Sequence, residues 1–279
     1  MQRDDGQFHN FLSKKGKFLD DVGSQDSFAR TFWALRFFKN YYCRDLPNKK
    51  KVQKIFEKSQ KYLLKLNYLR SKAFILLGLG YGVNESEIKL ILKLGQDLIS
   101  HFKKNSSPNW CWFENTLTYS NAILPLGLFS TYQITKNKKF LVIALKSLDF
   151  LIKICQEKGI PVPIGNAGWY KKDGKKALFD QQCIDVADMV LALVAAFRIT
   201  CKQKYLGLAR KWFLWFYGNN ISQVQMYDEK TGAAFDGLKP WGKINKDQGA
   251  ESTLAYLMSY LALAEIEKER NATTNFFTN

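Results

Sequence analysis

The sequence predicts an all-α fold, an (α/α) toroid in which an inner ring of helices is surrounded by an outer ring. Apolar residues recur with a helical period along most of the chain. Segments that are apolar on nearly all sides alternate with amphipathic ones, and a helix that is apolar all round must be surrounded by protein. Long loops lead into four of the five predicted inner helices, with a short link near Asn67 as the exception, whereas the loops leaving the inner helices are short.

These patterns predict nine helices, of which five are inner. The inner helices are expected at residues 24–42, 70–81, 115–132, 184–197 and 250–266, and the outer helices at 50–66, 85–102, 138–155 and 204–217. Asn84, followed by Glu85 and Glu87, is a helix start signal. A superhelical repeat solenoid is the alternative, but the loops vary in length and no fixed period is present.

Composition favours one large folded domain, residues 1–279. The chain is 46% apolar and 15% aromatic, which is enough to fill a sizeable core. No stretch rich in proline, glycine or serine divides it. The single domain is therefore the simplest interpretation.

The net charge and the cysteines indicate which partners and which cellular compartment to expect. The formal net charge is +17, but the lysines are scattered over amphipathic segments, so nucleic acid is not the expected partner. The cysteine count of five is odd and no CxxC pair occurs, which favours a reducing compartment. No signal peptide or membrane-length apolar run is present. We expect a cytoplasmic protein without a membrane partner.

Four long loops are expected at one mouth of the toroid. They are residues 1–23, 103–114, 156–181 and 218–249, each of which leads into an inner helix. Inner helices of such a ring all begin at the same end, so these loops should converge there. Loops gathered on a rigid scaffold are where function usually resides.

Aromatic, acidic and amide residues are concentrated in or near these loops. Exposed indole and phenol rings can stack on sugar rings, amides and acids can bind sugar hydroxyl groups, and carboxylates can transfer protons. We expect catalytic carboxylates at Glu114, Asp180 and Glu251. The expected substrate-binding residues are His9, Asp26, Trp110, Trp112, Tyr119, Asn121, Trp169, Tyr170, Gln181, Gln182, Asp236, Trp241 and Gln248.

Five ordered blocks resemble a bacterial domain of the six-hairpin glycosidase superfamily. The blocks read FHNF, GSQDSFARTFWAL, WCWFENTLTYSNAILP, GWY followed by FDQQCIDVADMV, and DGLKPWGKINKDQGAESTLAYL. Members of this family are found beside, or fused to, glycosyltransferases. The resemblance therefore implies a glycosidase-like toroid and a glycosyltransferase as a partner.

Two features, the number of helices and the residue at position 25, depart from the pattern that the resemblance implies. The superfamily has six hairpins, so either N-terminal helices are absent from this chain or its ring is incomplete. Gln25 stands where the family pattern has an acidic residue, which argues against catalysis at that corner.

Each candidate also has a structural interpretation. Glu114 and Glu251 fall in predicted first turns, where the helix dipole favours a carboxylate. Asp180 can cap the helix that follows, and Asp26 with Ser27 can form another cap. Asp236 lies in a Phe-Asp-Gly turn, and His9 can pack among aromatic side chains. Asp185 and Asp188, on an otherwise apolar helix, are expected to be salt-bridged structural acids, with Asp185 pointing into the toroid lumen as the alternative.

The leading hypothesis is a carbohydrate-active, glycosidase-like protein that binds or hydrolyses an oligosaccharide with two carboxylates. The alternative is a non-catalytic glycan-binding or interaction module that serves a glycosyltransferase. We expect no cofactor and no metal, because His9 and His101 are the only histidines and no metal-binding or phosphate-binding motif occurs.

Overall fold

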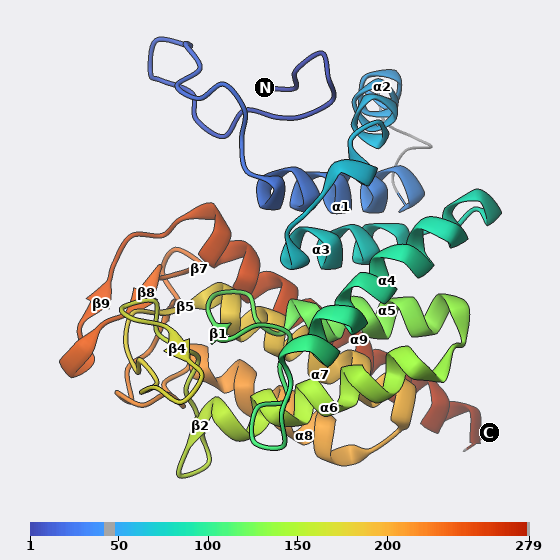
Figure 1. The fold of residues 1–279 in the computed structure, drawn as a ribbon. Helices are drawn as coiled ribbons and strands as arrows, with labels where there is room; N and C mark the ends of the chain where they lie inside the picture. Colours follow the sequence, from blue (N-terminus) through green and yellow to red (C-terminus); the bar gives the residue numbers. More distant parts are fainter. Residues whose placement is uncertain (42–47, 278–279) are drawn as a thin grey trace. The chain divides into compact units, whose positions relative to one another are not determined.

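The computed structural model describes residues 1–41 and 48–277, and over these ranges it contains nine α-helices. They are α1 (Gln25–Tyr41), α2 (Lys49–Gln60), α3 (Leu69–Leu79), α4 (Glu85–Asn105), α5 (Ile123–Thr135), α6 (Lys138–Ile154), α7 (Cys183–Thr200), α8 (Gln203–Phe213) and α9 (Ala250–Phe277) (Figure 1). The prediction of an all-α chain is confirmed. None of the described helices is long and apolar enough to cross a membrane.

The remaining regular elements are short and lie mainly between the helices. The 3₁₀ helices are η1 (Leu63–Lys65), η2 (Leu214–Phe216) and η3 (Pro240–Gly242). The strands are β1 (Thr116–Leu117), β2 (Gln156–Glu157), β3 (Ile160–Pro161), β4 (Tyr170–Lys171), β5 (Gln181–Gln182), β6 (Tyr227–Asp228), β7 (Ala233–Ala234), β8 (Gly237–Leu238) and β9 (Ile244–Asn245). They form the antiparallel pairs β1–β4, β2–β3 and β6–β7 and a sheet of order β5–β8–β9.

The chain forms two compact units. Unit 1 comprises Met1–His101 and Gly127–Ile143, and unit 2 comprises Phe102–Leu126 and Ala144–Asn279. The loops at 103–114, 156–181 and 218–249 all belong to unit 2, whereas the N-terminal loop belongs to unit 1.

Unit 1 is organised around the packing of α1 on α3. Helix α1 buries Phe28, Phe32 and Arg36, which recur every four residues and so share one face. A Cβ added at Gly78 of α3 would lie 2.9 Å from the Phe32 ring, so the glycine allows the close approach of the two helices. Figure 1 shows α1 and α3 side by side.

Arg36 is buried in unit 1 and links three segments. It donates to the carbonyl groups of Tyr81 and Gly82 and forms an ion pair with Glu87 at 2.6 Å. The Glu87 carboxylate also accepts from the backbone N–H of Asn84 at 3.0 Å, which is one half of a capping box. This confirms the start signal expected near Asn84.

Unit 2 is built around α7, which is buried along nearly its whole length. Helices α8 and α9 pack against it. Helix α8 is amphipathic and buries Tyr205, Leu206, Ala209 and Trp212 on one face. Here the predicted alternation of an apolar helix with an amphipathic neighbour is confirmed.

One predicted helix begins later than expected. The helix expected from residue 115 begins at Ile123, because residues 115–122 form β1 and a turn instead. Ser120 has a φ of 46°, and the Asn121 side chain bonds to the backbone N–H and carbonyl of Thr118. Such local side-chain bonds compete with helix formation.

The other predicted helices differ mainly at their ends. The one expected at 50–66 ends at Gln60 and is followed by η1, and the one at 204–217 gives way to η2 after Phe213. The expected end of the first helix at residue 42, and Cys43, lie outside the described residues.

Helix α9 is not surrounded by protein as an inner helix should be. It exposes Leu254 (56%), Leu257 (40%) and Leu261 (56%), which lie on one face at helical spacing. Within unit 2 the helix is therefore not covered on all sides as expected, because none of the described elements of this unit covers this face.

Candidate functional site

The first connection between loops of unit 2 joins β1 to β4. Leu117 pairs with Tyr170 and Thr116 with Lys171. The pairing continues at the next residue, where the N–H of Lys172 donates to the carbonyl of Asn115 at 2.8 Å. The segment after Glu114 is thereby held against the segment that contains Trp169 and Tyr170.

The second connection is the sheet β5–β8–β9. Gln182 pairs with Gly237, which in turn pairs with Asn245. The Cys183 thiol adds a bond to the carbonyl of Phe235 at 3.0 Å. This sheet brings the residue before β5, Asp180, to the loop that carries Asp236 and leads into α9.

The loop at 165–180 joins these two connections. The N–H of Asn166 donates to the Asp180 carbonyl at 3.1 Å, and the N–H of Ala177 donates to the Trp169 carbonyl at 2.9 Å. A Cβ at Gly165 would lie 1.8 Å from the Phe179 carbonyl oxygen, so only glycine fits there. Three of the four predicted loops are thus linked by main-chain hydrogen bonds within unit 2.

Glu114 is half-buried and lies in the loop rather than in a helix. Its expected place in the first turn of a helix is wrong, because α5 begins only at Ile123. The Glu114 carbonyl accepts from the Trp110 indole at 2.7 Å, which fixes the backbone before β1. The dipole of α5 therefore does not explain why an acidic residue occurs at position 114.

Asp180 is also half-buried, and it does not cap α7. The N-cap residue is Gln182, which makes no side-chain cap bond among the described residues. Asp180 has a φ of 43°, in the left-handed region that non-glycine residues enter at an energetic cost. Residues held in such conformations cluster at functional sites.

Glu251 lies in the first turn of α9, as expected, and is exposed. The N-terminus of this helix is organised by Asp236. One Asp236 carboxylate oxygen accepts from the Gly249 N–H at 2.8 Å and from the Ser252 hydroxyl at 2.7 Å. Asp236 thus has the structural role that its turn suggested, and it positions the helix that carries Glu251.

Trp110 and Trp112 are not available as stacking surfaces. Trp112 has 0% and Trp110 4% of its surface exposed. Trp110 packs edge-on against Phe150 and Tyr170, with ring centroids 5.4 and 5.3 Å apart. The expectation that these two indoles contact a sugar is wrong, because both belong to the core of unit 2.

Trp169, Tyr170 and Tyr119 remain partly accessible. The rings of Tyr119 and Trp169 lie 6.3 Å apart at 47°, and all three side chains are half-buried. Trp169 has a φ of 58°, which is uncommon for a bulky side chain. The β1–β4 pair places these aromatic residues beside the Glu114 segment.

The amide residues divide into structural and accessible groups. Gln181 is buried and accepts from the Trp215 indole at 2.9 Å, and the buried Asn121 stabilises its own turn. Gln182 is half-buried, and the exposed Gln248 donates to Asp228 at 2.9 Å. The binding roles expected for Asn121 and Gln181 are therefore wrong, because burial and protein partners occupy their polar groups.

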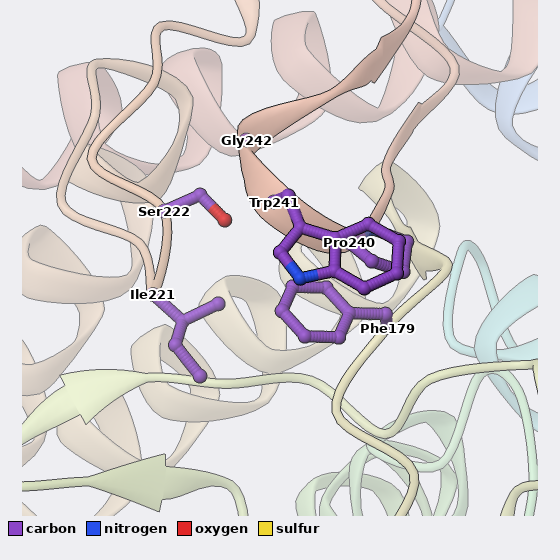
Figure 2. Close-up of a pocket in the computed structure, with 6 residues that line it drawn as sticks. All are labelled: Phe179, Ile221, Ser222, Pro240, Trp241 and Gly242. Atoms are coloured by element: carbon purple, nitrogen blue, oxygen red, sulfur yellow. The ribbon is translucent and has the colours of Figure 1, made fainter.

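An open hollow of ≈ 620 Å³ lies beside Trp241, whose side chain is 89% exposed. The residues that line it are Phe179, Ile221, Ser222, Pro240, Trp241 and Gly242. Figure 2 shows Ile221 and Ser222 on one side and Trp241, Pro240 and Phe179 on the other. Of these, the sequence identified only Trp241, because the others carry no chemical signature by themselves.

Two expected site residues belong to unit 1. His9 stacks on Phe18 at 3.9 Å, and its Nδ1 lies 2.8 Å from the Asp20 carbonyl oxygen, so it packs as a structural residue. Asp26 forms an ion pair with Arg30 at 3.3 Å. The helix cap expected at Asp26 and Ser27 is instead Ser24, whose hydroxyl accepts from the Ser27 N–H.

Gln25 and Asp188 have structural partners as well. The Gln25 side chain accepts from the N–H groups of Asn67 and Tyr68, at 2.8 and 3.3 Å. Asp188 is buried and accepts from the Ser120 hydroxyl at 2.6 Å. This contact agrees with a structural role for Asp188, whose partner here is a serine hydroxyl, while the expected salt bridge stays a prediction.

The fold is similar to that of several solved carbohydrate-active enzymes. D-mannose isomerase superposes with a TM-score of 0.69 at 16% identity, covering 98% of this chain and 78% of that one. A GH76 α-mannanase from Bacteroides thetaiotaomicron has a TM-score of 0.65 at 12% identity, covering 88% and 70%. A sugar epimerase from a ruminal bacterium has 0.65 at 10% identity, covering 90% and 74%.

No family model and no curated protein sequence matches the chain. At these identities the structural likeness establishes the fold alone. The chain therefore shares the all-α fold of these enzymes.

Proposed function

We propose that this chain is a carbohydrate-active, glycosidase-like protein whose loops in unit 2 bind and hydrolyse a glycan. The observation that carries the proposal is the pair of strand connections, β1–β4 and β5–β8–β9. They link the segments of Glu114, Asp180 and Glu251 with accessible aromatic rings. Stacking surfaces beside carboxylates are what glycan cleavage requires.

Carboxylates are the groups in unit 2 that suit proton transfer. Both histidines, His9 and His101, belong to unit 1. The thiols of Cys155 and Cys183 are buried, and burial raises the pKa of each from 9.0 to about 12. Within unit 2, Asp and Glu side chains therefore suit proton transfer better than these thiols, which supports a glycosidase mechanism with two carboxylates.

The proposed mechanism uses two of the three carboxylates Glu114, Asp180 and Glu251. One protonates the leaving oxygen, and the other activates water or attacks the sugar carbon directly. A separation of about 6.5–9.5 Å between the carboxyl groups leaves room for water and inverts the configuration, whereas about 5–5.5 Å gives retention. Trp169 and Tyr170 would hold the sugar ring against the acids.

The test is an oligosaccharide screen by thermal shift, followed by product analysis of each hit. A ligand that binds only the folded chain raises its melting temperature. The variants Glu114→Gln, Asp180→Asn and Glu251→Gln keep the shape of each side chain, so at least two of them should lose turnover and keep the native melting temperature. Glu229→Gln, an exposed loop acid of unit 2, is the matched control. Full turnover in all three variants would refute the mechanism.

The alternative, a glycan-binding module that serves a glycosyltransferase, is an outcome of the same screen. It predicts glycan binding by the wild-type chain without any product, and unchanged affinity in the three amide variants.

We further propose a single domain over residues 1–279 and a cytoplasmic location. The unpaired state of Cys111, Cys155, Cys183 and Cys201 supports a reducing compartment.

A further inference from the structure

The turn between β8 and β9 has an unfavourable backbone. Pro240, Trp241 and Gly242 form its tip, closed by a bond of 2.8 Å from the Lys239 N–H to the Lys243 carbonyl. Trp241 has φ 55° and ψ 36°, which is the left-handed region. A bulky side chain in this region costs roughly 1–2 kcal/mol. Gly242, with φ 70°, has no such cost.

The Trp241 side chain gains almost nothing from folding. With 89% of its surface exposed, the indole forgoes the stabilisation that burial of a large aromatic ring provides. It instead borders the hollow that is also lined by Phe179 of the 156–181 loop and by Ile221 from an earlier part of the 218–249 loop. Figure 2 shows the indole at the edge of this hollow. Strained residues cluster at functional sites, so a strained backbone that presents an exposed ring beside a hollow points to contact with a ligand.

Two lysines face each other across the same turn. Leu238 pairs with Ile244, so Lys239 lies directly opposite Lys243, and both residues have extended backbones. Directly opposed residues of an antiparallel pair project from the same face. Like charges at such positions destabilise a hairpin. Neither lysine forms an ion pair with an acid among the described residues.

The loop that supplies Phe179 adds more positive charge. Lys171 and Lys175 in this loop are exposed and Lys172 is half-buried, and none of the three has an ion-pair partner among the described residues. Lys176, by contrast, forms an ion pair with Glu157 at 2.8 Å. The hollow is therefore bordered by two lysine-bearing loops and one exposed indole.

We propose that the Lys239–Lys243 turn binds an acidic saccharide, with the indole on the apolar face of a sugar ring and both ammonium groups on its anionic substituent. A uronate carboxylate and a sulfate ester share this chemistry. The ligand relieves the repulsion between Lys239 and Lys243, which the free protein leaves uncompensated. This inference rests on the proposed function, because it names the substrate class of the same loops.

The experiment measures binding of four probes by titration calorimetry. They are an oligogalacturonate hexamer, a heparin-derived hexasaccharide, neutral mannohexaose, and a single-stranded oligonucleotide of matched charge. The wild-type chain should bind at least one acidic saccharide about tenfold more tightly than the neutral one, since two charge-assisted contacts are added. The preference should shrink as salt is raised, because the lysines are exposed.

Variants locate the preference on the turn. Lys239→Gln/Lys243→Gln should lose about tenfold in affinity for the acidic saccharide and keep the affinity for mannohexaose. Trp241→Ala should weaken binding of both saccharide classes, because it removes the stacking surface. The control Lys153→Gln/Lys268→Gln removes the same charge from exposed sites on α6 and α9 and should change neither affinity.

The possible failures are distinct. Equal binding of acidic and neutral saccharides, or an acidic preference that survives in the Lys239→Gln/Lys243→Gln variant, overturns the inference and leaves the proposed function standing. Binding of the oligonucleotide as tightly as the acidic saccharide also overturns it, because a general polyanion surface is then present. Binding of no saccharide of either class overturns the proposed function and this inference together.

Discussion

Removal of the Asp236 carboxylate should destabilise the N-terminus of α9. In the structure one Asp236 oxygen accepts from the Gly249 N–H at 2.8 Å and from the Ser252 hydroxyl at 2.7 Å. Ser252 is only 7% exposed, so its hydroxyl cannot replace this partner with bulk water. We therefore expect Asp236→Ala to lose both bonds.

The size of the effect follows from these two contacts. A hydrogen bond to a charged group contributes about 1.5 kcal/mol at the lower end of its range, so the variant should lose about 3 kcal/mol of unfolding free energy. For 279 residues the unfolding entropy is about 0.6 kcal/mol/K, which converts this loss to a decrease of about 5 °C in melting temperature. Asp236→Asn retains one oxygen and should lose about half as much.

The assay is thermal unfolding followed by circular dichroism. The matched control is Asp247→Ala, because Asp247 is an exposed acid of the same loop whose side chain accepts no bond to the helix terminus among the described residues. The control should melt within about 1 °C of the wild-type chain, as surface substitutions usually do. Equal melting temperatures for Asp236→Ala and Asp247→Ala would refute the assignment of Asp236 as the group that organises α9.

Three further predictions concern the core and the thiols. Gln181→Ala should lower the unfolding free energy by about 2 kcal/mol, because the buried Trp215 indole loses its acceptor. Substitution of the half-buried neighbour, Gln182→Ala, should have little effect. Urea titrations that give both variants the same loss of unfolding free energy would contradict this. Arg36→Met should lower the unfolding free energy by about 3–5 kcal/mol, because Glu87 and two carbonyl groups lose their partner. The exposed Lys49→Met is the control, and an equal loss of unfolding free energy in both variants would contradict this role of Arg36. At pH 8 a thiol reagent should label Cys201 and then Cys111, while burial and a pKa near 12 protect Cys155 and Cys183 until the chain unfolds; mass spectrometry that finds early labelling of Cys183 would contradict the structure.

Helical segments were predictable because their signal is local. Asn84 and Glu87 indicated the start of α4, and the amphipathic pattern of residues 138–155 matches α6 closely. The start of α5 was not predictable in this way. The apolar period continues through residues 115–122, and only the turn around Ser120 and Asn121, with the pairing of β1 and β4, shows that the helix begins later.

The residue types of the candidate site and the loops that carry them could be predicted from the sequence. Which of these side chains are exposed could not be predicted. Trp112 and Trp241 have the same chemistry and both lie in loops, yet one is 0% and the other 89% exposed. The difference depends on packing against Phe113 and Phe150 in one case and on a strained hairpin tip in the other. The contact of Trp112 with Phe150 is distant in sequence, and the exposure of Trp241 depends on the turn between β8 and β9. The helical period of the sequence indicates neither.

The most direct test of the central claim is a crystal structure of the Glu114→Gln/Asp180→Asn variant with an oligosaccharide identified in the screen. We expect a sugar ring stacked on Trp169, Tyr170 or Trp241, with a glycosidic oxygen within hydrogen-bonding distance of residue 114, 180 or 251. A saccharide bound only to unit 1, or to a face of unit 2 remote from these residues, would contradict it.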